Sequence, residues 1–179
     1  DGFSATQPNI QSTGNGYYNL YYSSNCPGGK GGFDLWRVRF SETGSFAKPE
    51  NLTVLNTKSD DITPFYYEND NALFFSTKGR PSIGGFDIYK SVLSNNTWQE
   101  PEHLNVPLNS SYDDLYFALQ NDNTFWLTSN REESATVAGD ACCYDIYRGN
   151  YLPVDLKTLS FSLPFQDSLT EVLFTLTEV

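Results

Sequence analysis

One motif recurs three times along the chain and constrains its fold more than any other feature. It reads GGFDLWR, GGFDIYK and CCYDIYR, at residues 31–37, 84–90 and 142–148. Its aspartates lie 53 residues apart (34 to 87) and then 58 residues apart (87 to 145). A repeat period of about 50 residues is typical of propellers, solenoids and arrays. The sequence therefore predicts three copies of one supersecondary unit.

The residue types favour strands over helices. Aromatic residues make up 16% of the 179 residues and charged residues only 18%. Aromatic side chains are enriched in strands, and clusters of Gly, Asn, Asp, Ser and Pro separate the short apolar segments. No window repeats apolar residues at helical spacing. We therefore predict an all-β chain with almost no helix.

The second repeat shows how one unit is built. Residues 63–67 and 72–76 read as a hairpin, and residues 86–92 follow as a third strand. A fourth strand over 97–102 contains Pro101, which removes a ladder donor and places this strand at the outer edge. Four antiparallel strands in about 50 residues match one blade of a β-propeller.

The third strand of each repeat has large apolar groups on both faces. In the second repeat, Phe86 and Ile88 point to one face, and Tyr89 points to the other with Asp87. Each face must then be covered by a neighbouring blade. About three blades do not close a ring. We therefore predict that residues 1–152 form a partial β-propeller, either cut from a larger propeller, which we favour, or completed by a partner molecule.

The repeat ends near residue 152. Residues 155–161 and 172–177 alternate apolar and polar side chains without the repeated motif, so we predict that 153–179 are the first strands of a β-sandwich. The loop at 135–141 enlarges the last repeat, and we expect it to contact a partner at the propeller rim. The chain starts at Asp1 and contains no methionine, so we expect a trimmed or mature piece of a longer product.

The acidic residues have two competing interpretations. We expect the motif acids to hold loops by accepting hydrogen bonds from backbone groups, because an unpaired buried carboxylate costs about 1 to 3 kcal/mol. Neighbouring acids on an extended strand point to opposite sides, which favours caps over a shared site. Calcium held by one acid from each blade is the alternative, since Ca²⁺ prefers oxygen ligands. The motif acids are Asp34, Asp87 and Asp145, and the weaker calcium candidates are Asp60, Asp61, Asp113 and Asp114.

No residue pattern indicates catalysis. The only histidine, His103, occupies the repeat position of Asn51, so a structural role explains it better than a general base. The chain has neither the Cys/His spacing of a zinc site nor a phosphate-cradling glycine loop before a helix. We therefore expect no catalytic residues, no cofactor other than the calcium considered above, and a protein that is not an enzyme.

The net charge limits the kinds of partner that the chain can bind. A formal charge of -11 opposes binding to nucleic acids and to anionic membrane surfaces. No stretch of about 18 apolar residues is present, so we expect no membrane span in this chain.

The three cysteines leave several bonding states open. These are a bridge between the neighbours Cys142 and Cys143, one bond to Cys26, or free buried thiols.

Several strings resemble a known family. LNSSYDD at 108–114, TSNR at 128–131 and YDIY at 144–147 resemble the TolB-like or PD40-type propeller of OmpA-family envelope proteins of Bacteroidetes, which include type IX secretion accessory proteins. In that family a carboxypeptidase-regulatory-like β-sandwich and a peptidoglycan-binding OmpA-type domain follow the propeller. The resemblance implies a periplasmic or outer-membrane-associated scaffold, or one at the cell surface, and supplies no catalytic residues.

Three classes of function follow. We favour a non-catalytic scaffold that binds other envelope or secretion-system proteins, within a parent protein that associates with peptidoglycan. An accessory propeller of a secreted hydrolase is the second class. A carbohydrate-binding propeller is the third, and it requires Tyr17, Tyr18 and Trp126 to line one open groove. Ser168 follows Asp167 in a predicted loop and is a candidate O-glycosylation site.

Overall fold

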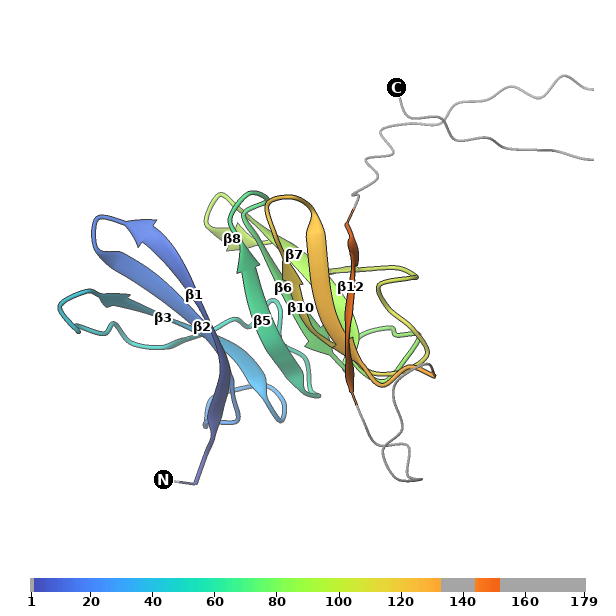
Figure 1. The fold of residues 1–179 in the computed structure, drawn as a ribbon. Coiled ribbons are helices and arrows are strands. Elements are labelled where there is room, and N and C mark those ends of the chain that lie inside the picture. Colours follow the sequence, from blue (N-terminus) through green and yellow to red (C-terminus); the bar gives the residue numbers. More distant parts are fainter. Residues whose placement is uncertain (1, 133–143, 152–179) are drawn as a thin grey trace, which may run out of the picture.

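The computed structural model describes residues 2–132 and 144–151, and within them the chain forms three antiparallel sheets and no helix (Figure 1). The first sheet contains β1 (Ala5–Gly14), β2 (Tyr17–Ser24), β3 (Asp34–Ser41) and β4 (Glu50–Asn51). The second contains β5 (Asp61–Tyr67), β6 (Ala72–Thr77), β7 (Asp87–Ser94), β8 (Thr97–Trp98) and β9 (Glu102–His103). The third contains β10 (Asp114–Leu119), β11 (Thr124–Ser129) and β12 (Asp145–Asn150). The prediction of an all-β chain is confirmed.

The three sheets share one register. The motif aspartate of each repeat pairs with the last residue of the preceding strand: Ser24 with Asp34, Thr77 with Asp87, and Ser129 with Asp145. Because these ladder positions match, residues can be compared from sheet to sheet by counting from them. The repeat found in the sequence is therefore a repeat of structure.

A bulge interrupts the first strand of every sheet at the same place. Gln7 in β1, Thr63 in β5 and Tyr116 in β10 have φ angles of 56°, 55° and 54°, and each lies at a register shift. The Gln7 amide joins the other two, since its Oε1 accepts from Thr63 N at 3.1 Å and its Nε2 donates to Tyr116 Oη at 3.1 Å. The bulges thus hold the three first strands close together.

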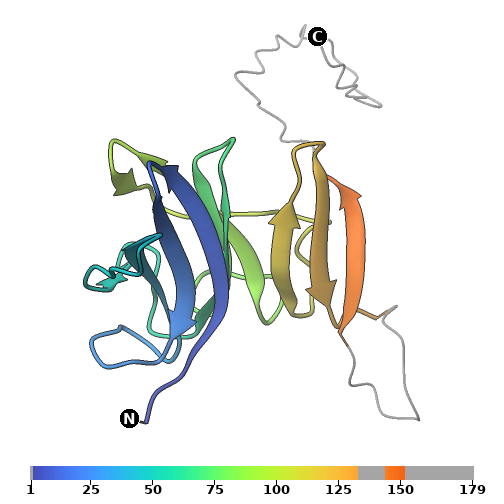
Figure 2. The same ribbon diagram turned by 60° about the vertical axis from the view of Figure 1, so that its left-hand side comes forward.

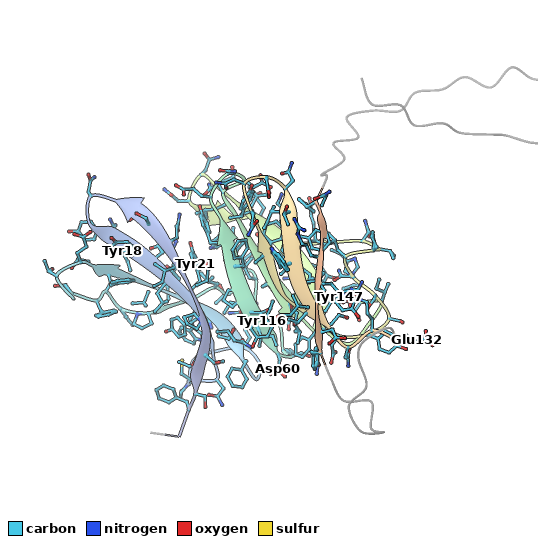
Figure 3. All side chains as sticks on the ribbon, viewed as in Figure 1. Tyr18, Tyr21, Asp60, Tyr116, Glu132 and Tyr147 are labelled. Carbon is cyan, nitrogen blue, oxygen red and sulfur yellow. The ribbon has the colours of Figure 1, made fainter. Side chains whose placement is uncertain are left out.

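The sheets lie side by side and bury two aromatic cores between them (Figure 2). Tyr21 of β2 stacks on Tyr66 of β5 with 5.4 Å between ring centroids, which closes the first sheet against the second. Phe74 of β6 packs on Phe117 of β10 at 4.8 Å, which closes the second sheet against the third. Figure 3 shows Tyr21 where the first sheet meets the second. The middle sheet is therefore covered on both faces, as its apolar pattern requires.

Each sheet has a forward face, toward the next sheet in the chain, and a rear face, toward the previous one. The forward face of the first sheet carries Tyr21 and Leu35, and that of the second carries Phe74 and Ile88 at the equivalent positions. Leu73 and Phe75 lie on the rear face of the second sheet and are at most 1% exposed. Both inter-sheet contacts therefore use the same pair of faces.

One predicted strand is wrong. Residues 97–102 do not form a single fourth strand, because β8 and β9 pair separately with β7. Pro101 lies between them and has no N–H to donate, and Gln99 N instead donates to Val92 O at 2.9 Å. The third sheet contains three strands within the described residues, so its predicted four-stranded form is not observed there.

No helix in the described part of the chain is long and apolar enough to cross a membrane. The predicted rim loop at 135–141 and the predicted sandwich strands of 153–179 lie outside the described residues, and so do Cys142, Cys143 and Ser168. Cys26 is a half-buried free thiol.

Candidate functional site

The first motif aspartate closes its own loop. Asp34 is completely buried and accepts hydrogen bonds from the backbone N–H of Lys30 and, at 3.0 Å, from that of Gly31. The Asn51 amide of β4 donates to the same carboxylate at 3.0 Å. Three donors therefore stabilise this buried charge.

The second motif aspartate repeats the arrangement. Asp87 is also completely buried, and it accepts from Ile83 N at 2.6 Å and from Gly84 N at 3.1 Å. His103 takes the place of Asn51 here, with its Nε2 2.7 Å from Asp87 Oδ2. The histidine ring also packs edge-on against Tyr89 at 5.1 Å. His103 is therefore held in a structural hydrogen bond at the repeat position predicted for it.

The motif glycines let the next repeat approach closely. A Cβ at Gly84 would lie 2.0 Å from the Tyr112 carbonyl oxygen, and one at Gly31 would lie 2.1 Å from that of Ser59. Any larger residue would push the two loops apart. The third motif aspartate, Asp145, keeps the ladder position opposite Ser129, and the loop before it lies outside the described residues.

Two buried amides have a role that the sequence analysis did not assign. Asn56 accepts from Leu35 N at 2.7 Å and donates to Leu35 O at 2.9 Å, so its side chain pairs with β3 as a strand backbone would. Asn109 does the same with Ile88, at 2.7 Å and 2.9 Å. The repeated Leu-Asn pairs at 55–56 and 108–109 were the signal for this role.

Two of the calcium candidates accept hydrogen bonds from the backbone of motif loops. Asp60 accepts from Phe33 N at 2.9 Å, and Asp113 accepts from Phe86 N at 2.8 Å, so each supports the motif loop of the preceding repeat. Burial and the nearby Asp113 carboxylate raise the pKa of Tyr144 to about 12. No group of three or more His, Cys, Asp or Glu residues within 2–132 and 144–151 is arranged to hold a metal ion.

The other two candidates are buried and differ in their partners. Asp114 Oδ1 forms an ion pair with Arg131 Nη2 at 2.5 Å. Asp61 occupies the same position in the second sheet, but its Oδ1 has no hydrogen-bond partner. By ladder count Gly79 stands at the Arg131 position, and the next residue, Arg80, donates to the Val54 and Leu55 carbonyls as Arg131 does to those of Pro107 and Leu108. Arg80 forms its ion pair with Glu100 and not with Asp61, so within the described residues Asp61 is a buried acid without an ion pair.

Burial raises the pKa of the Asp61 carboxyl above its ordinary value. Two contacts lower this pKa in part. They are the side chain of Thr77, which lies across the ladder, and the hydrogen bonds that Thr57 donates to the other oxygen, Oδ2. The Asp34 carboxylate raises it again by like-charge repulsion. Burial and the second carboxylate prevail over the threonines, so protonation of Asp61 is easier in the folded chain.

The three aromatic residues predicted to line a carbohydrate groove do not come together. Tyr17 and Tyr18 are neighbours on β2 and point to opposite faces of the first sheet. Trp126 lies on β11 of the third sheet, with the Arg148 guanidinium 5.6 Å from its ring centroid. Figure 3 shows Tyr18 on the outer part of the first sheet, on the far side of the second sheet from β11. These residues therefore cannot bind one ligand together.

Within residues 2–132 and 144–151, no element covers the rear face of the first sheet or the forward face of the third. The rear face of the first sheet contains an apolar hollow of about 280 Å³, lined by Ala5, Thr6, Pro8, Leu20, Tyr22 and Val38. On the forward face of the third sheet, Trp126 is 38% exposed and Ile146 is 71% exposed. The equivalents of these residues in the middle sheet, Phe74 and Ile88, are fully buried.

No protein-family model matches the sequence, and no curated protein matches it. Among solved structures, the α-L-arabinofuranosidase PaAbf62A from Podospora anserina in complex with cellotriose is similar over 70% of this chain, with a TM-score of 0.43 and 12% sequence identity. The chain spans 42% of the length of that structure.

Proposed function

We propose that the three sheets are successive blades of a β-propeller and that the chain is a non-catalytic interaction scaffold of the bacterial cell envelope. In this proposal the rear face of the first sheet is covered by a further sheet of the same repeat. The parent protein is then outer-membrane- or peptidoglycan-associated and binds other envelope or secretion-system proteins, as the OmpA-family resemblance implies.

The repeated inter-sheet contact carries the proposal. A forward face with an aromatic residue at the Tyr21 or Phe74 position meets a rear face twice within the chain. On the uncovered rear face, Leu20 and Tyr22 stand where the second sheet has Leu73 and Phe75. Because the two rear faces carry apolar residues at the same positions, we expect each to pack against the forward face of a repeat sheet. Repeat sheets bury continuous apolar surface only when neighbours stack on both sides.

The roles of the buried polar groups support a scaffold over an enzyme. The two carboxylates Asp34 and Asp87 and the only histidine are each engaged in hydrogen bonds that close loops within the repeat. A general base or nucleophile must instead face a substrate. These groups stabilise the blades, and binding is left to the sheet faces and rims.

Cysteine labelling tests the packing. In a variant without native cysteines, Leu20→Cys is expected to react with a maleimide in the isolated 179-residue chain and to be protected in the full-length parent protein. Leu73→Cys, at the equivalent covered position, should be protected in both. Ile83→Cys is 49% exposed as isoleucine and should react in both.

Equal labelling of Leu20→Cys in the isolated chain and in the parent protein would contradict a covering blade. Protection in the isolated chain, together with a dimer in sedimentation velocity, would identify a second copy as the occupant and also overturn the proposed arrangement. Cell fractionation of the parent protein tests its location, and recovery in the cytoplasm would contradict an envelope scaffold.

A further inference from the structure

Two adjoining hollows on the outer part of the first sheet form what we call the basic groove, defined by Tyr17, Arg37, Arg39 and Lys48. Their volumes are about 320 Å³ and 370 Å³, and both are lined by Arg39 and Ala47. The basic groove shares no residue with the apolar hollow on the rear face. A test of the groove is therefore independent of the proposed blade packing.

The local backbone places the three cations together. Arg37 and Arg39 are two residues apart on β3, so their side chains leave the same face about 7 Å apart. The chain then turns back, with a bridge between Phe40 and Phe46 and a bond from Ala47 N to Arg39 O at 2.8 Å. This return brings Lys48 beside the two arginines.

The groove has more positive charge than its neighbours neutralise. Arg37 pairs with Glu50 at 2.6 Å, and Glu50 is the one carboxylate that lines the two hollows. Arg39 and Lys48 have no carboxylate within 4.0 Å in the described part of the chain. In a chain with a formal charge of -11, two unpaired cations in one hollow favour an anionic ligand.

One aromatic ring, that of Tyr17, lies beside these cations. Tyr17 is 44% exposed, and its ring centroid lies 4.5 Å from the Arg39 guanidinium carbon. Phe46 does not lie beside these cations, because it stacks on Phe40 at 5.4 Å and Phe40 stacks on Tyr18, on the opposite face of the sheet. An exposed flat ring next to a cation can pack on an apolar ring face of a ligand while the cation binds its acid group.

We propose that the basic groove binds a uronic-acid unit of an acidic polysaccharide. Arg39 and Lys48 bind the sugar carboxylate, the Tyr17 ring packs against the C–H face of the pyranose, and the polar groups of Asn19 and Thr13 lie within reach of its hydroxyls. The ligand thus needs both an acid group and a flat apolar face.

An acidic peptide fits the groove less well. Extended peptides bind most often by adding a strand to a free sheet edge. Beside the groove this edge is already used, because Arg39 O accepts from Ala47 N and Ser41 N donates to Ser45 O at 3.0 Å. Without edge pairing, a peptide would lose its main-chain hydrogen bonds, whereas a sugar needs only side chains.

Titration calorimetry with the 179-residue chain tests the proposal, with tetragalacturonate as the probe. We expect tetragalacturonate to bind, cellotetraose and a tetraglutamate peptide to bind at least about tenfold more weakly, and added salt to weaken tetragalacturonate binding. Arg39→Gln, Lys48→Gln and Tyr17→Leu should each raise the Kd for tetragalacturonate about tenfold. Tyr17→Phe, which keeps the ring, Phe46→Leu, on the opposite face of the sheet, and Lys58→Gln, an exposed cation outside the groove, should leave the Kd unchanged.

Several results would overturn the proposal. They are no binding of tetragalacturonate, equal binding of cellotetraose, or binding of tetraglutamate as tight as that of the uronate. Unchanged affinity of Arg39→Gln and Lys48→Gln would also overturn it. Both substitutions are at the surface, and near-wild-type thermal unfolding of each variant shows that a change in Kd reports the groove and not the fold.

Discussion

Replacing Asp87 by alanine is expected to lower the free energy of unfolding by about 3 to 4 kcal/mol. The carboxylate is completely buried and accepts from Ile83 N, Gly84 N and His103 Nε2. Alanine removes the buried carboxylate that these three partly buried donors share. Because Gly84 also lies against the Tyr112 loop, the damage extends to the contact with the next repeat.

Urea unfolding followed by tryptophan fluorescence measures this effect. Asp34→Ala should cost a similar amount, since Asp34 holds the same position in the first repeat. Glu100→Ala is the matched control, because the Glu100 carboxylate is 78% exposed and its ion pair with Arg80 should contribute less than about 1 kcal/mol. If Asp87→Ala and Glu100→Ala lower the free energy of unfolding equally, the motif aspartate does not stabilise the fold through its hydrogen bonds.

The same substitution at two equivalent positions is expected to change stability in opposite directions. Asp61→Asn should stabilise the chain by about 1 kcal/mol at neutral pH, because the carboxylate is buried beside Asp34 without a cation. An amide oxygen can still accept from Thr57. Asp114→Asn should destabilise it by about 2 kcal/mol, because Arg131 loses the buried half of its ion pair.

The effect of Asp61 also depends on pH. An acid whose pKa is higher in the folded chain than in the unfolded chain contributes stability below its unfolded value, here 3.8, and loses that contribution as the pH rises through the folded pKa. Wild-type stability should therefore fall relative to Asp61→Asn as the pH rises above 3.8. Near that value the two proteins should differ little.

Urea unfolding of wild type, Asp61→Asn and Asp114→Asn from about pH 4 to about pH 8 measures both differences. The difference between wild type and one variant isolates the substituted group, since the other carboxylates titrate in both proteins. A stability gain of Asp61→Asn that stays constant across this range would exclude a raised pKa as its cause. Destabilisation by Asp61→Asn at neutral pH would contradict the absence of a partner for Oδ1.

The strands and the repeat were predictable because their signals are local. Alternating apolar residues and turn residues mark β5 and β6 in residues 63–67 and 72–76, with the observed β5 starting two residues earlier at Asp61. The Leu-Asn pairs at 55–56 and 108–109 recur 53 residues apart, but the hydrogen bonds of Asn56 and Asn109 to the strand backbone could be seen only in the three-dimensional structure. Pro101 correctly predicted that residues 97–102 lie at an edge of the sheet. Because Pro101 has no N–H, this segment forms two short strands, β8 and β9, and not one.

The sequence by itself determined an all-β chain of repeated units, since period and side-chain alternation depend only on neighbours along the chain. Only the tertiary structure decided that Asp114 meets Arg131 while Asp61 meets no cation, because each partner comes from another strand. The same holds for the basic groove, where the return of the chain brings Lys48 beside Arg39. Charges and hydrogen bonds act through space, so residue types alone could not show which of them meet.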